Sequence, residues 1–469
     1  MTMPPRAGSL PAIPIGDVAA AVGGRLVGGS PTVEIRGASV DSRHVSPESL
    51  YVALRGERVD GHRFVGDAIR AGAGAALVEL ELDLAAPQVV VSDSLRGLGD
   101  LAAWWRSRHA VRVIGITGST GKTIAKEIVA DVLSRDRRTL RSEGNLNSVI
   151  GLPMTLLRLD GSQEAAVLEM GMYTTGEIAR MVEIARPEVG IVLSVHATHL
   201  ERAGSLERIA QAKAELPEGL PSDGLALLNA DDPRVAAMRD LTAARVWTFG
   251  LGPAADIRAD EITSLGLGGT EFTISAPWAT ARVRSATPGR HLVPHALAAA
   301  AVAEWMDVPF DAVAQALEAG SHAAHRMAIT SAGSGATIVD DTYNASPVSV
   351  AAALRFLAET PVPDGRRRIA VLGDMLELGP EEERLHREIG DLAAATADEI
   401  VAVGERGAWI AEGAASAGHS RVHRAEDAED AAAMLDRAVA PGVGDLVLVK
   451  GSRGIGLDRT VDLLVEGDA

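Results

Sequence analysis

The stretch GITGSTGKTIAKE, residues 115–127, decides how the chain is interpreted. The apolar, β-branched residues Val111, Val113, Ile114 and Ile116 lead into it, and residues 124–133 leave it with apolar side chains at helical spacing. This order predicts a buried strand, a glycine turn and a helix. Backbone N–H groups in such a turn, and at the start of such a helix, face an anion. The stretch therefore predicts a loop that binds phosphate.

The loop matches the T-G-S-T-G-K-T form, because Ile116 stands where the longer G-x-x-x-x-G-K-[ST] pattern requires glycine. Its glycines let the backbone turn and approach a phosphate closely. Lys122 can reach the β- and γ-phosphates of a nucleotide, and the Thr123 hydroxyl can bind Mg²⁺. An ordinary glycine turn before a helix is the alternative, but the Lys-Thr pair between strand and helix favours nucleotide binding. The expected nucleotide-binding residues here are Thr117, Gly118, Ser119, Thr120, Gly121, Lys122 and Thr123.

The composition excludes several classes of protein. The 469 residues predict about three domains, and the 47% hydrophobic content can fill several cores. Because cysteine is absent, disulfides, thiolate metal sites and a cysteine nucleophile are excluded. No apolar run is long enough to cross a bilayer and no signal-peptide pattern opens the chain, so we expect a cytoplasmic protein without membrane insertion. The net charge of −18 argues against general nucleic-acid binding.

Strand-like and helical runs alternate along the chain and predict an α/β fold of three domains. This alternation is typical of βαβ units around mainly parallel sheets. Residues 1–110 are expected to form an N-terminal α/β module. Residues 111–325 open with the phosphate loop and are expected to form a P-loop ATPase-like domain with a mainly parallel sheet. Residues 326–469 are expected to form a Rossmann-like C-terminal domain.

Three side chains outside the loop could support phosphate chemistry, although each has a simpler explanation. Glu169 ends a strand-like run, where a carboxylate can reach a phosphate-bound metal but is usually just solvated. His199 follows another such run, but a lone histidine is more often structural. Lys213 lies in a helical pattern, where a lysine is normally solvated. The arginines at positions 366–368 are likewise expected to be solvated.

Together these residues resemble the Mur ligase family of ATP-dependent, amide-forming enzymes of peptidoglycan synthesis. The family's phosphate loop has the T-G-x-x-G-K-T form, and the resemblance is dense in GNLNSVIGLPMTLL, LEMG and THLERAGSLERIAQAKAEL. The resemblance implies ATP and Mg²⁺ as cofactors, with Thr123, Glu169 and His199 as metal ligands. It also implies that Lys213 is carbamylated and supports the metal. Lys122, His199 and Lys213 would be the catalytic residues.

The third region is similar to the branch of that family that adds D-alanyl-D-alanine to a UDP-MurNAc-tripeptide. The segments DDTYNASPVSVAAAL, VLGDMLELG and VKGSRG carry this similarity, and the Asp-Tyr-Ala-His-x-Pro segment of the branch that adds diaminopimelate or lysine is absent. The implied reaction uses ATP to phosphorylate the peptide carboxylate, after which the dipeptide amine displaces phosphate. Residues 1–110, 111–325 and 326–469 would bind the UDP-sugar, ATP and the dipeptide, respectively, in a chain that acts as a monomer.

The resemblance also implies contacts around the nucleotide and the substrates. Arg326 would contact the phosphates, Asp341 would hold the ribose, and His295 would bind adenine. The expected substrate-binding residues are Ser42, Arg43, Asn145, Asn147, Tyr343 and Asn344. Leu292 and His295 stand where the family usually has asparagine, which leaves open a divergent ligase that joins another acid and amine. Two further hypotheses are a non-catalytic nucleotide-binding homologue and a plain P-loop ATPase or kinase.

Overall fold

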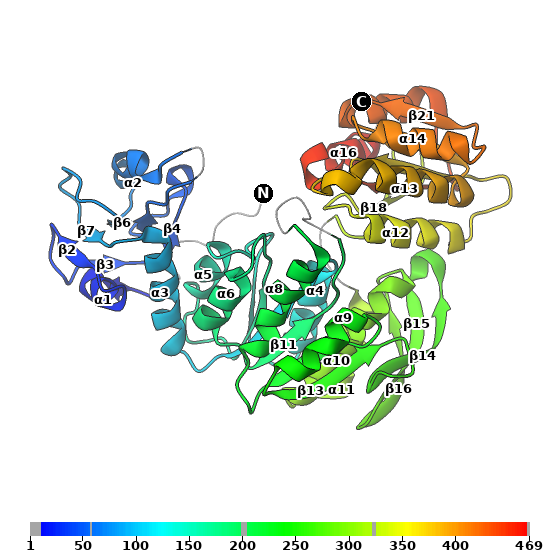
Figure 1. Cartoon of the computed structure of the whole chain (residues 1–469). Helices are drawn as coiled ribbons and strands as arrows, with labels where there is room; N and C mark the ends of the chain where they lie inside the picture. The colour runs from blue at the N-terminus through cyan, green and yellow to red at the C-terminus, as the bar shows by residue number, and fades with distance from the viewer. Residues whose placement is uncertain (1–10, 57–58, 198–203, 321–324, 467–469) are drawn as a thin grey trace.

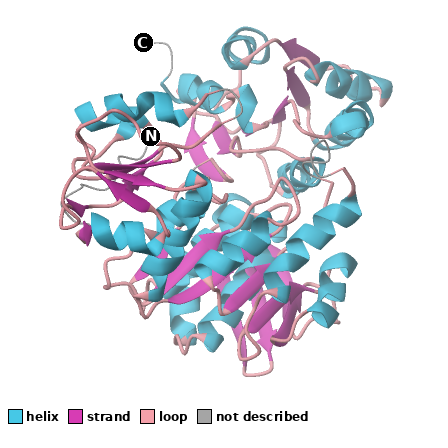
Figure 2. Cartoon of the chain, turned by 60° about the vertical axis from the view of Figure 1, so that its left-hand side comes forward, coloured by secondary structure: helices cyan, strands magenta, loops and turns pink. Residues whose placement is uncertain are grey.

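The computed structural model describes residues 11–56, 59–197, 204–320 and 325–466 (Figure 1). The chain forms three α/β bodies in a row: an N-terminal body up to residue 107, a central body over residues 112–319 and a C-terminal body from residue 325. Helices cover the sheets of all three bodies (Figure 2). This arrangement confirms the predicted α/β class with mainly parallel sheets. None of the helices in the described residues is long and apolar enough to cross a membrane.

The N-terminal body is built on a five-stranded sheet of order β2-β7-β6-β5-β4, in which only the β2–β7 pair is antiparallel. The strands are β2 (Arg25–Val27), β4 (Ala38–Ser39), β5 (Leu50–Val52), β6 (Ala75–Val78) and β7 (Gln88–Val90), with a separate antiparallel pair of β1 (Ile13–Pro14) and β3 (Glu34–Ile35). The helices are α1 (Ile15–Ala21), α2 (Val65–Arg70) and α3 (Ser94–Ser107). Helix α3 leads directly to the central sheet.

The central body has a nine-stranded sheet of order β16-β15-β14-β13-β12-β11-β8-β10-β9. All pairs from β9 to β14 are parallel, and β14 to β16 add an antiparallel meander. The strands are β8 (Arg112–Thr117), β9 (Thr139–Arg141), β10 (Ala165–Glu169), β11 (Val189–Val192), β12 (Leu225–Asn229), β13 (Arg245–Gly250), β14 (Ile257–Ser264), β15 (Thr270–Ala276) and β16 (Ala279–Ser285). The helices are α4 (Lys122–Leu133), α5 (Gly151–Leu156), α6 (Glu177–Ala185), α8 (Leu206–Glu218), α9 (Pro233–Ala236), α10 (Val293–Trp305) and α11 (Phe310–Ala319).

The parallel strands of the central body are buried on both faces. Along β8, Ile114 and Ile116 pack into the core that contains α4, α10 and α11, while Val113 packs into the core that contains α3, α5, α6 and α8. Successive side chains of a strand point to opposite faces, so a strand covered on both sides needs an unbroken apolar run. The run at positions 113–116 has this pattern. It fixes β8 in the middle of the sheet and presents the phosphate loop at the sheet's carboxyl edge.

The C-terminal body has a six-stranded sheet of order β17-β18-β22-β19-β20-β21, parallel except for the β17–β18 pair. The strands are β17 (Ala328–Ser331), β18 (Thr337–Asp340), β19 (Arg368–Gly373), β20 (Glu399–Val403), β21 (Val422–Ala425) and β22 (Leu446–Lys450). The helices are α12 (Pro347–Glu359), α13 (Glu382–Thr396), α14 (Gly407–Ser416), α15 (Ala428–Met434) and α16 (Asp458–Glu466).

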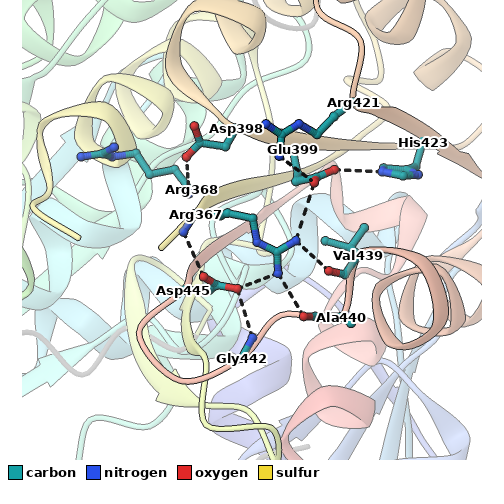
Figure 3. Close-up of polar contacts among 10 residues, drawn as sticks. All are labelled: Arg367, Arg368, Asp398, Glu399, Arg421, His423, Val439, Ala440, Gly442 and Asp445. Atoms are coloured by element: carbon teal, nitrogen blue, oxygen red, sulfur yellow. Dashed lines mark hydrogen bonds and ion pairs between the residues drawn. The ribbon is translucent and has the colours of Figure 1, made fainter. Parts of the chain in front are cut away.

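The arginines at the start of β19 are held by the protein, so the expectation that they are solvated is wrong for Arg367 and Arg368 (Figure 3). The Arg367 guanidinium donates to the Asp445 carboxylate at 2.7 Å and to the Val439 carbonyl at 2.8 Å. The Arg368 side chain donates to the Leu357 carbonyl at 3.1 Å. Both arginines thereby satisfy backbone carbonyls where neighbouring helical segments end, which a sequence pattern of three basic residues cannot reveal.

Asp445→Ala is expected to lower the free energy of unfolding by about 1–3 kcal/mol, because it removes the nearer of the two carboxylates paired with the partly exposed Arg367. Burial acts to raise the pKa of Asp445, but hydrogen bonds from Arg367 outweigh it, so the pKa lies below its usual value. A depressed carboxyl pKa gives stability that is present above the unfolded pKa and is lost as the pH falls through the folded pKa. Urea denaturation should therefore show a smaller difference between variant and wild type below about pH 4 than at pH 7. The exposed Asp364→Ala is the control and should change little at either pH.

Candidate active site

The phosphate loop lies where the sequence predicts it, between β8 and α4. Gly121, the last residue before the helix, has a φ of +81°, which disfavours any residue with a side chain. A Cβ atom at this position would also lie 2.1 Å from Nε2 of His295. Space and backbone conformation together therefore require glycine at the helix N-terminus, where the N–H groups point toward an anion.

The loop after β11 fixes the phosphate loop. The Ser119 N–H donates to the Ser194 carbonyl at 2.8 Å, and the Ser119 hydroxyl donates to the His196 carbonyl at 3.0 Å. The Thr120 N–H donates to the Ser194 hydroxyl at 3.3 Å. Ser194 and His196 could not be predicted from the sequence as supports for the site, because they lie about 75 residues from the loop and belong to no local motif.

A hydroxyl and a carboxylate suited to Mg²⁺ meet beside the loop. The Thr123 hydroxyl donates to Glu169 Oε2 at 2.9 Å, and Asn147 Nδ2 donates to Glu169 Oε1 at 2.8 Å. Both Thr123 and Glu169 are buried, so the expectation of a solvated glutamate does not apply. Hard oxygen atoms of this kind are the ligands that Mg²⁺ prefers. The third predicted ligand, His199, lies outside the described residues, and the remainder contains no cluster of three or more His, Asp or Glu side chains suited to a metal.

Lys213 on α8 is buried, which excludes the expectation of a solvated lysine. Burial lowers its pKa well below the usual lysine value, and the positive charge of Lys122 lowers it further. Its amine is therefore biased toward the neutral, nucleophilic form. The chain has only four lysines, Lys122, Lys126, Lys213 and Lys450, and none of them is an exposed surface residue. Exposed positive charge on this protein is carried by arginine, so its lysines stand out as interior groups.

Arg326 reaches the phosphate loop from the C-terminal body. Its Nη2 donates to the Thr123 hydroxyl at 2.8 Å, and its Cζ lies 4.0 Å from the centre of the Tyr343 ring. His295 approaches the same loop from α10. Its Nδ1 donates to the Leu292 carbonyl at 3.3 Å, which directs an unprotonated Nε2 toward the loop. Burial lowers the pKa of His295 to about 4, so the ring is neutral near pH 7.

Other predicted site residues lie at a distance from this cluster or are engaged elsewhere. In the N-terminal body, Ser42 and Arg43 form part of a short 3-10 turn, and Arg43 pairs with Asp41 at 2.6 Å. Asn145 is exposed in the loop after β9. Asp341 is buried and pairs with Lys450, whose Nζ also donates to the Asn344 carbonyl at 3.0 Å. The structure thus brings together Lys122, Thr123, Glu169, Asn147, His295, Arg326 and Tyr343.

Models of known protein families match each of the three bodies. Models of the Mur ligase family's catalytic domain, the Mur ligase middle domain and the Mur ligase glutamate ligase domain match residues 34–99, 116–303 and 325–453. The UDP-N-acetylmuramoyl-tripeptide–D-alanyl-D-alanine ligase of Escherichia coli is 38% identical, with 94% of this chain and 96% of the relative covered. The chain belongs to the Mur ligase family. The Bacillus subtilis enzyme of the same name is 35% identical over 92% of this chain and 93% of its own.

Solved structures similar to this chain include MurF ligases. A MurF crystal structure from Acinetobacter baumannii is 31% identical and superposes with a TM-score of 0.88, covering 98% of this chain and all of that one. A MurF ligase from Thermotoga maritima in complex with ADP is 28% identical with a TM-score of 0.81, covering 92% and 97% of the two chains. These neighbours confirm the three-part α/β architecture of a Mur ligase.

Proposed function

We propose that this chain is an ATP-dependent ligase that joins D-alanyl-D-alanine to a UDP-MurNAc-tripeptide during the synthesis of peptidoglycan precursors. The observation that carries the proposal is the hydrogen bond from Arg326 to Thr123. It joins the C-terminal body to the phosphate loop, and a plain ATPase or kinase site would not need that body. The relatives in Escherichia coli and Bacillus subtilis bear the names of enzymes with this activity.

In the first step, an oxygen of the tripeptide's terminal carboxylate attacks the γ-phosphorus of ATP. A new C(O)O–P bond forms, the bond to the bridging oxygen breaks, and ADP leaves with the electron pair. Lys122 and Arg326 offset the negative charge on the transferring group, which is the main contribution a protein makes to phosphoryl transfer. Thr123 and Glu169 would hold Mg²⁺, which supplies further positive charge at the phosphate oxygens when bound.

In the second step, the amine of D-alanyl-D-alanine attacks the acyl carbon of the mixed anhydride. The tetrahedral intermediate collapses to the amide, and phosphate leaves with the C–O bonding electrons and takes up the proton lost by the amine. Water competes with the amine for the acyl phosphate, so the site must exclude it. Arg326 brings the C-terminal body into contact with the phosphate loop, and we expect closure of that body over the site to exclude water.

We assign the UDP-sugar to residues 1–110, ATP to residues 111–325 and the dipeptide to residues 326–469. Ser42 and Arg43 would lie near the sugar nucleotide, and Asn145 and Asn147 near the sugar-peptide. Asp341 would hold the ribose, and Asn344 would face the dipeptide because its side chain is exposed. ATP and nucleotide-linked precursors are cytoplasmic metabolites, so we place the enzyme in the cytoplasm, acting as a monomer.

Phosphate release tests the proposed function. The purified chain is incubated with ATP, Mg²⁺ and UDP-MurNAc-tripeptide, with and without D-alanyl-D-alanine, and the product is weighed by mass spectrometry. We expect release that depends on both substrates and a product heavier by the dipeptide less one water. Nucleotide binding without that product would reject this substrate pair in favour of another acid and amine. Rapid hydrolysis with no amine present would indicate an ATPase.

We further propose that Lys213 captures CO₂ as a carbamate, a step that consumes the neutral amine and releases one proton. With ¹³C-labelled bicarbonate near neutral pH, the enzyme should show one carbamate carbon signal by NMR. The signal should be absent in Lys213→Ala and present in Lys126→Arg, a control at another buried lysine. Ligase activity of Lys213→Ala should fall about 10- to 100-fold, as expected when a residue that supports a metal site is lost. An unchanged signal in Lys213→Ala would exclude this residue.

A further inference from the structure

We propose that Tyr343 is a positioning residue, whose ring holds the Arg326 guanidinium at the phosphate loop so that it can meet the γ-phosphate of ATP. This inference rests on the proposed use of ATP and assigns Tyr343 a role other than the substrate contact expected from the sequence. Arg326 Cζ lies 4.0 Å from the ring centre, well within the range of a cation–π interaction. The same guanidinium donates a hydrogen bond from Nη2 to the Thr123 hydroxyl of the phosphate loop.

The hydrogen bonds of Arg326 do not fix its side chain by themselves. Its Nε is buried and has no hydrogen-bond partner among the described residues. The nearby carboxylates are engaged: Asp340 accepts from His325 Nδ1 at 2.7 Å, and Glu169 accepts from Thr123 and Asn147. Among the described residues, the Tyr343 ring therefore complements the Thr123 hydroxyl in holding the guanidinium in place.

The backbone presents the arginine and the ring to each other. Strands β17 and β18 pair antiparallel with Ala328 opposite Asp340, and the pairing continues past the strand ends, where the Tyr343 N–H donates to the His325 carbonyl at 3.1 Å. His325 and Met327, which flank Arg326, have φ values of +58° and +54°. Left-handed conformations are unfavourable for residues with side chains and cluster at functional sites. The strained turn aims Arg326 out of the C-terminal body.

An aromatic ring suits this task better than a carboxylate would. A carboxylate would form an ion pair and neutralise the charge that the phosphate needs. The face of a ring attracts the cation but accepts none of its in-plane N–H groups, so those that do not bond Thr123 can donate to phosphate oxygens. The interaction uses the face of the ring and not the Tyr343 hydroxyl, so phenylalanine should be able to replace tyrosine at this position.

The test compares Tyr343→Leu with Tyr343→Phe, using calorimetric affinities for ADP and for the non-hydrolysable β,γ-imido analogue of ATP with Mg²⁺. We expect Tyr343→Leu to weaken analogue binding by about tenfold and to lower kcat by a similar factor, while ADP affinity and the KM for D-alanyl-D-alanine change less than about twofold. Tyr343→Phe should stay within about twofold of wild type in every parameter. Thermal unfolding checks that both variants fold.

A double-mutant cycle separates positioning of Arg326 from an independent role of Tyr343. In an Arg326→Ala background, Tyr343→Leu should cause no further loss of analogue affinity beyond about twofold. Three outcomes would overturn the inference. Tyr343→Leu could still lose about tenfold in analogue affinity in the Arg326→Ala background, or Tyr343→Phe could lose as much affinity as Tyr343→Leu. The effect of Tyr343→Leu could also be confined to a higher KM for D-alanyl-D-alanine. The nucleotide affinities need no acceptor substrate. They would therefore uphold the inference even if ligation of the proposed substrates failed.

Discussion

Replacing Lys122 by alanine is expected to lower the rate of amide formation by about a thousandfold or more. Removing one preorganised donor from a developing oxyanion costs about 10²–10³ in rate, and Lys122 carries a full charge in addition. Burial lowers its pKa, the nearby Glu169 raises it, and Arg326 lowers it again. The site thus holds an ammonium group that lacks full solvation, and the phosphates of ATP supply the missing counter-charge. The attraction between Lys122 and the phosphate oxygens therefore stabilises the transferring phosphoryl group.

The measurement is phosphate release coupled to product mass at saturating ATP, with ADP affinity determined separately. Arg135→Ala is the matched control, because it removes one positive charge from an exposed residue just beyond the other end of α4. It should leave kcat and ADP affinity within about twofold of wild type, as is usual for an exposed charge away from the site. A Lys122→Ala enzyme that retained more than a tenth of the wild-type kcat would contradict the role assigned to this lysine.

The phosphate loop could be predicted because its determinants are consecutive in the sequence. The apolar run that becomes β8, the two glycines and the Lys-Thr pair lie within about a dozen positions and have the same consequence in any parallel sheet. Glu169 could be suspected as the end of a strand. Its contact with Thr123 depends on β10 lying next to β8, with Glu169 opposite Ile116. The order of strands in a sheet cannot be inferred from one local stretch of sequence. The order results from how the helices cover both faces of the sheet.

The hydrogen bond between the C-terminal and central bodies could not be predicted from the sequence. Arg326 and Thr123 are 203 residues apart, and the resemblance implied a phosphate contact without indicating a hydroxyl or a ring as partner. The contact of the Tyr343 ring with Arg326 was not anticipated from the sequence, which suggested only a substrate contact for Tyr343. The antiparallel meander at 257–285 was also not anticipated, because its half-exposed strands lack the long apolar runs that mark the parallel ones. Of these, the contact between Arg326 and Thr123 joins distant parts of the chain.

Gly121→Ala is expected to abolish nucleotide binding, with ADP affinity falling by at least a hundredfold. The new Cβ would lie 2.1 Å from His295 Nε2, and the ring has little room to move because it is buried and its Nδ1 donates to Leu292. The backbone at a φ of +81° would also resist the side chain, and either adjustment turns the loop's N–H groups away from the phosphate.

Gly418→Ala isolates the backbone cost, because Gly418 has a φ of +87° and no atom within 4 Å of the new Cβ. This control should lose about 1 kcal/mol of stability in urea denaturation and keep its ADP affinity and activity. Gly121→Ala combined with His295→Ala removes the steric clash and keeps the backbone strain. It should therefore recover part of the ADP affinity by calorimetry. If Gly121→Ala bound ADP as wild type does, then the close approach of His295 to the loop would have no part in shaping the phosphate site.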